Sequence, residues 1–469
     1  MIKFTDFPFL LFLGLLIPIF YKTTVSKRWI VLLIASIIFN ISWSGIFTVI
    51  WVLMVALCYF AGIYLGDAQK DKKSKKWVLT LSILLALIPL LNFKYLFPNN
   101  EPADSVLSNW LAPIGLSYYT FLIIGYLTDV KRRYIKPEKH IGYLALYLGL
   151  FPTLLAGPLE RAKNLLPQLR NSKDYDIENL KAGAIFILWG LFKKIVLAAR
   201  LNDHTAPVFH NPDDYTGWSI CMAILLFSIQ LYCDFSGYCD IATGAARLFG
   251  IRLSKNFANR YYFTPTRTES WNGWNITITN WFRDYIFFSI SKGVTNQNRL
   301  EFNRLLTFIV TGLWHGASWS FVIWGFLQWT YVTFETRTKA FWQKSFAIVR
   351  LVPNTSMYIF IQIVIKQLTG TLIMGWFRAE GLESGLKLYA NMFGFGNGVS
   401  TIFKPGFLLT LGLFMVMDFL NREMGESEDI ASFLLKASWK KRNAYLIVLL
   451  ILLQSFGQIQ VSDFYYIRF

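Results

Sequence analysis

The sequence predicts an all-α fold, a polytopic membrane helix bundle of about eleven transmembrane helices with additional re-entrant and interfacial helices. Two observations predict this fold class. Hydrophobic residues make up 54% of the chain and charged residues only 16%, whereas soluble domains carry more charge. Apolar runs close to the ~20 residues that cross a bilayer also recur from end to end. These runs lie near residues 5–20, 29–45, 46–66, 77–97, 113–130, 183–201, 217–245, 303–334, 355–376, 405–420 and 443–460.

The basic residues follow a pattern that predicts the orientation of the chain. The formal net charge is +18, yet Lys and Arg cluster in alternate loops, and the segment 99–109 carries only acidic charges. This alternation indicates that the basic loops face the cytoplasm. It also argues against nucleic acid as a partner and favours membrane lipids. We expect cytoplasmic loops at 67–76, 131–140 and 421–442, and external loops at 98–110 and 202–216.

Two apolar segments do not fit a single straight crossing. The first, 141–157, lies between two basic segments and contains Phe151-Pro152, which predicts a re-entrant hairpin broken at that dipeptide. The second, 303–334, has basic residues on both flanks and is interrupted by Gly312 and Gly316. It predicts either two short half-crossings or one tilted, broken helix.

Several chemistries are disfavoured because their motifs are missing. The chain has no G-x-S-x-G and no Gly-Lys dipeptide, so a nucleophile elbow and a Walker A loop are not expected. Cys233-Asp234 with Cys239-Asp240 comes nearest to a metal site, but thiolate sites normally add more ligands. We therefore expect no metal and no bound cofactor, and we expect the four cysteines to be reduced packing residues.

The segment TGLWHGASWSFVIWG (311–325) places His315 in an apolar stretch. One interpretation is a core histidine bonded to a helix backbone. The other is a functional residue, because the small residues Gly312, Gly316, Ala317 and Ser318 remove side-chain volume around the ring and leave room for another molecule. Burial disfavours the charged imidazole, and a neutral imidazole that faces a cavity is what a general base needs.

Polar residues inside two further apolar stretches are candidates for function. The segment 231–250 carries Asp234, Asp240 and Arg247. Asp240 and Arg247 are seven residues apart and share a helix face, so they could form an internal ion pair that fixes helix packing, or they could contact substrate. In the segment 270–288, aromatic and apolar residues recur at helical spacing, which predicts an amphipathic interfacial helix. Asn275 lies at the edge of its apolar face, where the amide can both donate and accept hydrogen bonds.

Several motifs together resemble the membrane-bound O-acyltransferase family. They are WHGASWSFVIWG, YCDFSGYCD, AGPLERAKNLLPQL and WNITITNWFRDY. Other stretches are similar to the bacterial branch that O-acetylates alginate, peptidoglycan and other extracellular polysaccharides. These are PIGLSYYTF (113–121), GLFKKIVLA (190–198), GWFRAE (375–380) and FYYIRF (464–469). The resemblance extends from about residue 90 to the C-terminus.

This resemblance implies one integral-membrane domain over residues 1–469, with peripheral helices at 1–90 and a catalytic core at 90–469 around a central reaction chamber. The expected location is the bacterial cytoplasmic (inner) membrane. Acetyl-CoA is the expected donor substrate on the cytoplasmic side. An SGNH-type extracytoplasmic acetyltransferase is the expected partner, which places the acetyl group on a polysaccharide acceptor.

The resemblance also assigns residues. His315 corresponds to the family histidine, and we expect it to deprotonate the acyl acceptor. Asn275 stands where the bacterial branch usually has histidine; asparagine cannot act as a base, but it can donate a hydrogen bond to an acyl carbonyl. The segment SISKG after WFRDYIFF departs from the Pro-Leu-Gly-Gly turn of relatives. The expected substrate-binding residues are Trp314, Trp271, Tyr232, Asp234, Ser236, Asp240 and Arg283.

Two alternative functions stay open at this point. D-alanyl transfer toward teichoic acid is one, although relatives of that kind usually carry a G-P-I-D-R-like motif where this chain has GPLER (157–161). The other is a transporter or polysaccharide exporter, because broken helices and buried charge also suit transport. Turnover of labelled acetyl-CoA separates acyl transfer from transport.

Overall fold

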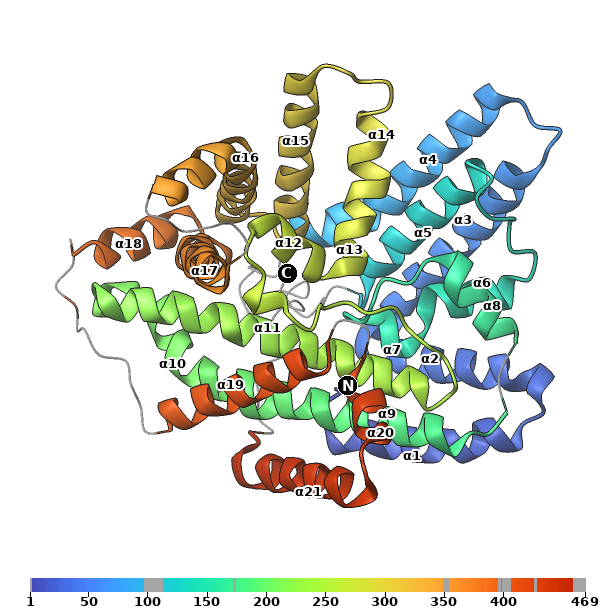
Figure 1. Cartoon of the computed structure of the whole chain (residues 1–469). Coiled ribbons are helices and arrows are strands. Elements are labelled where there is room, and N and C mark those ends of the chain that lie inside the picture. Colours follow the sequence, from blue (N-terminus) through green and yellow to red (C-terminus); the bar gives the residue numbers. More distant parts are fainter. Residues whose placement is uncertain are drawn as a thin grey trace, which may run out of the picture. The chain divides into compact units, whose positions relative to one another are not determined.

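The structure, a computed structural model, is helical throughout the part of the chain that it describes (Figure 1). The described residues are 2–96, 113–171, 174–348, 355–394, 398, 406–425 and 428–458. Within these ranges every regular element is a helix, so the all-α prediction is confirmed there. The predicted external loop 98–110 and the motif 464–469 lie outside the described residues.

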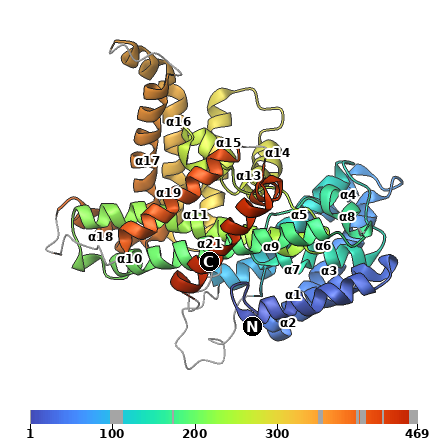
Figure 2. The same ribbon diagram turned by 60° about the horizontal axis from the view of Figure 1, so that its bottom comes forward.

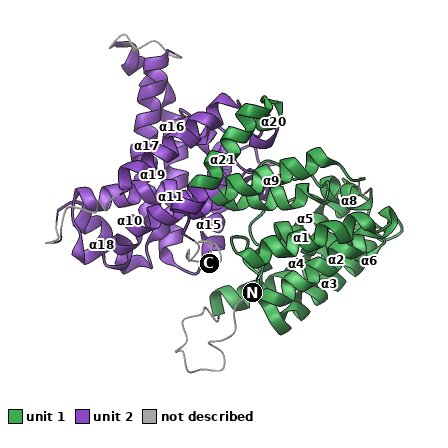
Figure 3. Ribbon diagram, turned by 90° about the horizontal axis from the view of Figure 1, so that it is seen from below, with its two compact units in different colours: residues 1–191, 237–255, 434–451 green, residues 192–236, 256–433, 452–469 purple. Residues whose placement is uncertain are grey.

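The chain divides into two compact units (Figure 3). Unit 1 comprises residues 1–191, 237–255 and 434–451, and unit 2 comprises residues 192–236, 256–433 and 452–469. The long helix α11 (Trp218–Arg247) contributes residues to both units. The predicted division between peripheral helices and a core at residue 90 stays a prediction.

Unit 1 is an assembly of closely packed helices. Its interior packing depends on glycines, since a Cβ atom on Gly149 would lie 2.6 Å from the Trp51 ring. In the same way, a side chain on Gly66 would collide with the ring of Pro137. The helices are α1 (Phe7–Lys22), α2 (Arg28–Ser44), α3 (Thr48–Gly66), α4 (Lys72–Leu91), α5 (Leu116–Lys131), α6 (Ile141–Gly149), α7 (Phe151–Leu154), α8 (Ala162–Arg170) and α9 (Ile177–Leu191), with parts of α11, α20 (Ile430–Lys436) and α21 (Trp439–Phe456).

The predicted break in the segment 141–157 is confirmed. Helix α6 ends at Gly149 and α7 begins at Phe151, because Leu150 leaves the helical conformation with φ −56° and ψ 114°. The N–H of Phe151 donates to the Ser36 hydroxyl at 3.1 Å, which gives the interrupted backbone a partner inside the protein. Whether the segment is re-entrant in a membrane stays a prediction.

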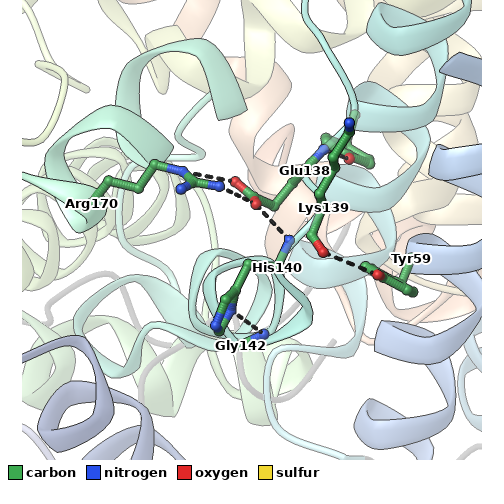
Figure 4. Close-up of polar contacts among 7 residues, drawn as sticks. Tyr59, Glu138, Lys139, His140, Gly142 and Arg170 are labelled. Carbon is green, nitrogen blue, oxygen red and sulfur yellow. Dashed lines mark hydrogen bonds and ion pairs between the residues drawn. The ribbon is translucent and has the colours of Figure 1, made fainter. Parts of the chain in front are cut away.

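A polar cluster around the buried Glu138 fixes the basic loop that follows α5 (Figure 4). The Glu138 carboxylate forms an ion pair with Arg170 and accepts the backbone N–H of His140 at 2.8 Å. The Tyr59 hydroxyl donates to the Lys139 carbonyl at 3.0 Å, which attaches the loop to α3. These contacts give the predicted cytoplasmic loop a defined structure in unit 1.

Five helical stretches in the described residues are long and apolar enough to cross a membrane. Val25–Gly66, Lys72–Leu96 and Ser356–Arg378 carry many exposed apolar side chains, as expected where lipid replaces water, whereas the other two stretches are mostly buried. The five stretches are Val25–Gly66, Lys72–Leu96, Ile177–His210, Trp218–Arg247 and Ser356–Arg378. They indicate a multi-pass membrane protein. The predicted number of about eleven transmembrane helices is not confirmed.

Unit 2 contains the segments with the sequence motifs around His315 and Asn275. Its long helices α16 and α17 run side by side (Figure 2). The elements are a π-helical turn (Phe192–Ala198), α10 (Ala199–His210), part of α11, α12 (Arg267–Gly273), α13 (Ile276–Trp281), a second π-helical turn (Phe282–Phe287), α14 (Phe288–Ile290), α15 (Gln297–His315), α16 (Trp319–Ile348), α17 (Ser356–Arg378), α18 (Leu382–Met392) and α19 (Phe407–Glu423).

The apolar segment 303–334 forms a helical hairpin. Helix α15 ends at His315, and α16 starts at Trp319, so the predicted interruption is confirmed and gives two separate helices. Helix α16 approaches α15 so closely that a side chain on Gly312 would collide with the Phe321 carbonyl oxygen. The hairpin therefore requires glycine at this crossing.

The prediction of one continuous amphipathic helix over 270–288 is wrong. The backbone of Asn275 is left-handed, with φ 42° and ψ 53°, and it separates α12 from α13. At this break the backbone bonds to the segment that precedes η6 (Tyr261–Phe263) instead of to its own helix. The Ile276 N–H donates to the Asn256 carbonyl at 2.9 Å. Helical spacing of aromatic residues did not reveal this break, because the apolar pattern continues through it.

Candidate active site

One cavity of about 310 Å³ in unit 2 brings the main sequence candidates together. Helices α12, α13, α15, α16 and α17 supply most of its walls. Five of the nine predicted site residues line it: Trp271, Asn275, Arg283, Trp314 and His315. These residues come from two stretches that are separated in the sequence, and the fold places them around the same space.

His315 is held by aromatic rings. It is the last residue of α15 and is 4% exposed. Ring centroids of Trp314, Phe377 and Trp324 lie 4.5, 4.8 and 5.3 Å from the imidazole centroid. These rings come from α15, α17 and α16, so three helices fix the imidazole and shield it from bulk water.

The expectation that the neighbouring glycines leave room beside His315 is wrong. A Cβ atom on Gly316 would lie 2.6 Å from the Phe321 ring, and the space next to Gly312 is taken by the Phe321 backbone. The glycines therefore permit close contact between α15 and α16.

Asn275 is held by hydrogen bonds and by an unusual backbone conformation. It is 4% exposed, and its Oδ1 accepts a hydrogen bond from Asn256 Nδ2 at 3.1 Å. Asn256 Oδ1 in turn accepts from the Thr277 backbone N–H at 3.0 Å and from the Thr277 hydroxyl at 2.9 Å. The left-handed region that Asn275 occupies is favourable for Asn, Asp and His among non-glycine residues. Sequence analysis missed both Asn256 and this backbone requirement.

The charged residues that line the cavity are arginines: Arg267, Arg283 and Arg304. Arg267 donates two hydrogen bonds to Gln328 Oε1, at 2.8 and 3.0 Å. Arg283 forms an ion pair with Asp284, and Arg304 forms one with Glu301. Among the residues described around this cavity, the lining includes no Asp or Glu. The charged side chains that line the cavity are therefore all cationic, and two of them are paired with carboxylates outside the lining. Sequence analysis identified Arg283 but not Arg267 or Arg304, because no motif distinguishes the latter two from other basic residues.

The four candidates on α11 do not line the cavity. Tyr232 supports it from behind, since its ring stacks on Tyr261 at 5.5 Å, and Tyr261 is a lining residue. The Asp234 carboxylate forms a buried ion pair with Lys194, which the sequence did not predict. The expected pair of Asp240 with Arg247 stays a prediction. Ser236 is buried on the same helix, and Asp240 belongs to the part of α11 in unit 1. Substrate contact by these residues stays a prediction.

The cysteine–aspartate pairs do not form a ligand cluster. Within the described ranges no group of three His, Cys, Asp or Glu side chains has a metal-binding arrangement. Cys233 and Cys239 are free and buried, and the Cys239 thiol donates to the Ala156 carbonyl at 3.3 Å.

The cavity itself offers the His315 imidazole, a group suited to proton transfer, and the Asn275 amide, a group suited to hydrogen bonding with a carbonyl oxygen.

Comparisons with known proteins agree with these motifs. The family model of the membrane-bound O-acyltransferases matches residues 33–375, so the similarity begins well before residue 90. The chain is 30% identical over 401 residues to the probable alginate O-acetylase AlgI of Azotobacter vinelandii, which covers 82% of this chain and 77% of the relative. It is 28% identical over 418 residues to the peptidoglycan O-acetyltransferase of Helicobacter pylori, with 80% and 75% covered. A teichoic acid D-alanyltransferase of Streptococcus thermophilus is 24% identical over 336 residues, with 68% and 79% covered.

Proposed function

Because the chain belongs to the membrane-bound O-acyltransferase family, we propose that it transfers acetyl from cytoplasmic acetyl-CoA toward an extracytoplasmic polysaccharide in the bacterial inner membrane. The protein is an O-acyltransferase; acetyl, its donor and its route are the proposal. The observation that carries the proposal is the cavity that His315 and Asn275 share. It combines a group that can accept a proton with a group that can stabilise a carbonyl oxygen.

The proposed reaction gives each of these residues one role. The His315 imidazole takes the proton from the acceptor hydroxyl while the hydroxyl oxygen attacks the thioester carbonyl. The Asn275 side-chain N–H donates to the oxygen that becomes negative. The new C–O bond forms, the C–S bond breaks, and the thiolate leaves with the proton that His315 had taken. The products are an acetyl ester and coenzyme A.

The three arginines in the lining support a phosphorylated donor. Arg267, Arg283 and Arg304 line the same cavity as His315, and guanidinium groups bind phosphate oxygens well. Coenzyme A carries phosphates at the end of its molecule opposite to the thioester. We propose that these arginines attract and orient this end while the acetyl group reaches His315.

The acceptor follows from the relatives named above, whose substrates are alginate and peptidoglycan. We propose that an SGNH-type extracytoplasmic acetyltransferase receives the acetyl group and places it on a polysaccharide. D-alanyl transfer is the runner-up, supported by the 24% identical relative. Acetyl transfer is favoured because the acetyltransferase relatives are more similar and cover more of this chain.

Purified protein tests the proposal in proteoliposomes supplied with labelled acetyl-CoA. The expected result is release of free coenzyme A together with a labelled acetyl ester on an added polysaccharide and partner transferase. A parallel reaction contains a D-alanyl carrier-protein thioester. Turnover of the D-alanyl donor alone would support the runner-up, and turnover of neither donor would contradict thioester-dependent acyl transfer.

A further inference from the structure

Asn256 lies outside the cavity lining but contacts Asn275 directly. We propose that Asn256 is a positioning residue that holds the Asn275 amide with its NH₂ group toward the reacting carbonyl. The inference rests on the proposed acyl transfer, in which Asn275 serves as a hydrogen-bond donor. It adds a residue that no motif identified and gives it a specific task.

The first step concerns the orientation of Asn256. The oxygen and nitrogen of an asparagine amide have nearly the same shape, so the hydrogen-bond network must decide which is which. A backbone N–H can only donate, and the Thr277 N–H lies 3.0 Å from Asn256 Oδ1. The atom that it meets must be an oxygen. The opposite end of the Asn256 amide is therefore the NH₂ group.

The second step transfers this orientation to Asn275. The Asn256 NH₂ group can only donate, and it lies 3.1 Å from Asn275 Oδ1. The oxygen of Asn275 consequently faces Asn256, and its Nδ2 lies at the other end of the amide. No described residue accepts a hydrogen bond from Asn275 Nδ2, and Asn275 lines the cavity. The two donor hydrogens are thus left for a bound carbonyl group.

The third step is the rigidity of the pair. Asn256 uses its carbonyl oxygen as well as its side chain to hold the segment around Asn275, since the Ile276 N–H donates to it at 2.9 Å. Two residues further on, the Ala258 N–H donates to the Gly273 carbonyl at 2.9 Å. Both side chains are 4% exposed, so water does not compete for their hydrogen bonds. Asn275 cannot turn without the loss of a buried hydrogen bond.

The same arrangement accommodates an imidazole at position 275. A histidine tolerates the left-handed backbone. Its unprotonated nitrogen would accept from the Asn256 NH₂ group, and its protonated nitrogen would then face the cavity as a donor. Asn256 would therefore select the useful tautomer of that ring. This predicts that Asn275→His retains a donor and measurable activity.

Asn256→Asp tests the inference with almost no change in shape. One oxygen of the new carboxylate still accepts from Thr277, but the other now requires a donor from Asn275. The Asn275 amide should rotate by half a turn and present its oxygen to the cavity. We expect kcat to fall by ~10²–10³-fold, as for loss of an oxyanion donor, with the KM for acetyl-CoA nearly unchanged.

Asn259→Asp is the matched control. Asn259 belongs to the same loop, and its Nδ2 donates to the carbonyls of Gly425 and Glu428 rather than to Asn275. It does not line the cavity. The control introduces the same carboxylate and also removes two partly buried hydrogen bonds, so its melting temperature should fall as well. Its kcat should stay within a few-fold of the wild type.

The combination Asn256→Asp with Asn275→His provides a rescue. The carboxylate accepts one ring N–H and favours the doubly protonated ring, whose second N–H again faces the cavity. Relative to Asn275→His alone, the activity of the double variant should increase as the pH falls. A purely structural role for Asn256 gives no such change in pH profile. Equal kcat losses in Asn256→Asp and Asn259→Asp would overturn the inference while leaving acyl transfer intact.

A spectroscopic measurement does not depend on activity. In protein labelled with ¹⁵N-asparagine, the Asn275 NH₂ signal is identified by its absence from Asn275→Gly. We expect its hydrogens to exchange with solvent faster in the wild type than in Asn256→Asp, where the carboxylate binds them. Exchange as slow in the wild type as in Asn256→Asp would overturn the inference, whether or not the protein turns over acetyl-CoA.

Discussion

The two sides of the cavity hold their functional residues by different means. His315, on the hairpin of α15 and α16, is fixed by ring packing and by a glycine crossing that permits backbone contact. Asn275, between α12 and α13, is fixed by a chain of hydrogen bonds and a left-handed backbone. The position of His315 should therefore depend on the volume of neighbouring side chains, and that of Asn275 on which groups donate and which accept hydrogen bonds. Substitutions that change only one of these properties distinguish the two sides.

The largest effect on rate is expected at His315. His315→Ala removes the proposed general base, and loss of such a group typically costs ~10²–10⁴-fold in rate. Phe377→Leu is the matched control, because Phe377 packs on the imidazole but has no proton to exchange. The acetyl-transfer rates of the two purified variants measure the difference. Equal losses would show that His315 matters through packing alone.

Removal of the Asn275 side chain should cost ~10²–10³-fold in kcat. Asn275→Gly is the appropriate variant, since glycine accepts φ 42° without strain. Asn275→Ala should add ~1–2 kcal/mol of destabilisation from the left-handed backbone. Thermal melts and transfer rates measured together test this separation of the two effects. If glycine and alanine variants melt alike, the left-handed backbone does not restrict this position.

Added side-chain volume where α15 crosses α16, on the His315 side of the cavity, should reduce both the stability of the fold and the activity. Gly312→Ala places a methyl group against the Phe321 carbonyl, and overpacking typically costs ~1–3 kcal/mol. Gly412→Ala is the control, because nothing lies within 4 Å of a Cβ atom there. The melting temperature should fall for Gly312→Ala and be unchanged or slightly raised for Gly412→Ala. An unchanged melting temperature in both variants would contradict the tight crossing of α15 and α16.

The smallest effect is expected on the binding of acetyl-CoA, through Arg267 in the cavity lining. Arg267→Lys keeps the positive charge but removes the planar guanidinium, which donates two hydrogen bonds to Gln328 and is suited to binding phosphate. We expect the KM for acetyl-CoA to rise several-fold, with little change in kcat. Steady-state kinetics at two ionic strengths check this. A lower kcat at unchanged KM would place Arg267 in the chemical step instead.

The contrast between the two sides also explains what the sequence could predict. Apolar runs and the glycine interruption predicted the break beside His315, because both features are local in the sequence. The break at Asn275 was missed, since the aromatic spacing continues through it and the left-handed backbone depends on a segment some twenty residues earlier, as the contact with Asn256 shows. The sequence suggested that the small residues beside His315 leave space for a ligand, whereas Phe321 fills the space next to Gly312 and Gly316. Which residues fill a space is a tertiary property that spacing alone does not contain.

The central claim is that His315 acts on the chemistry and does not serve to hold the donor or the fold. Equilibrium binding of acetyl-CoA to His315→Ala, measured with its melting temperature on the same sample, tests this claim most directly. The account predicts that acetyl-CoA binds with wild-type affinity and that the melting temperature falls no further than in Phe377→Leu, although turnover is lost. Loss of acetyl-CoA binding, or a large fall in melting temperature that accounts for the lost activity, would contradict it.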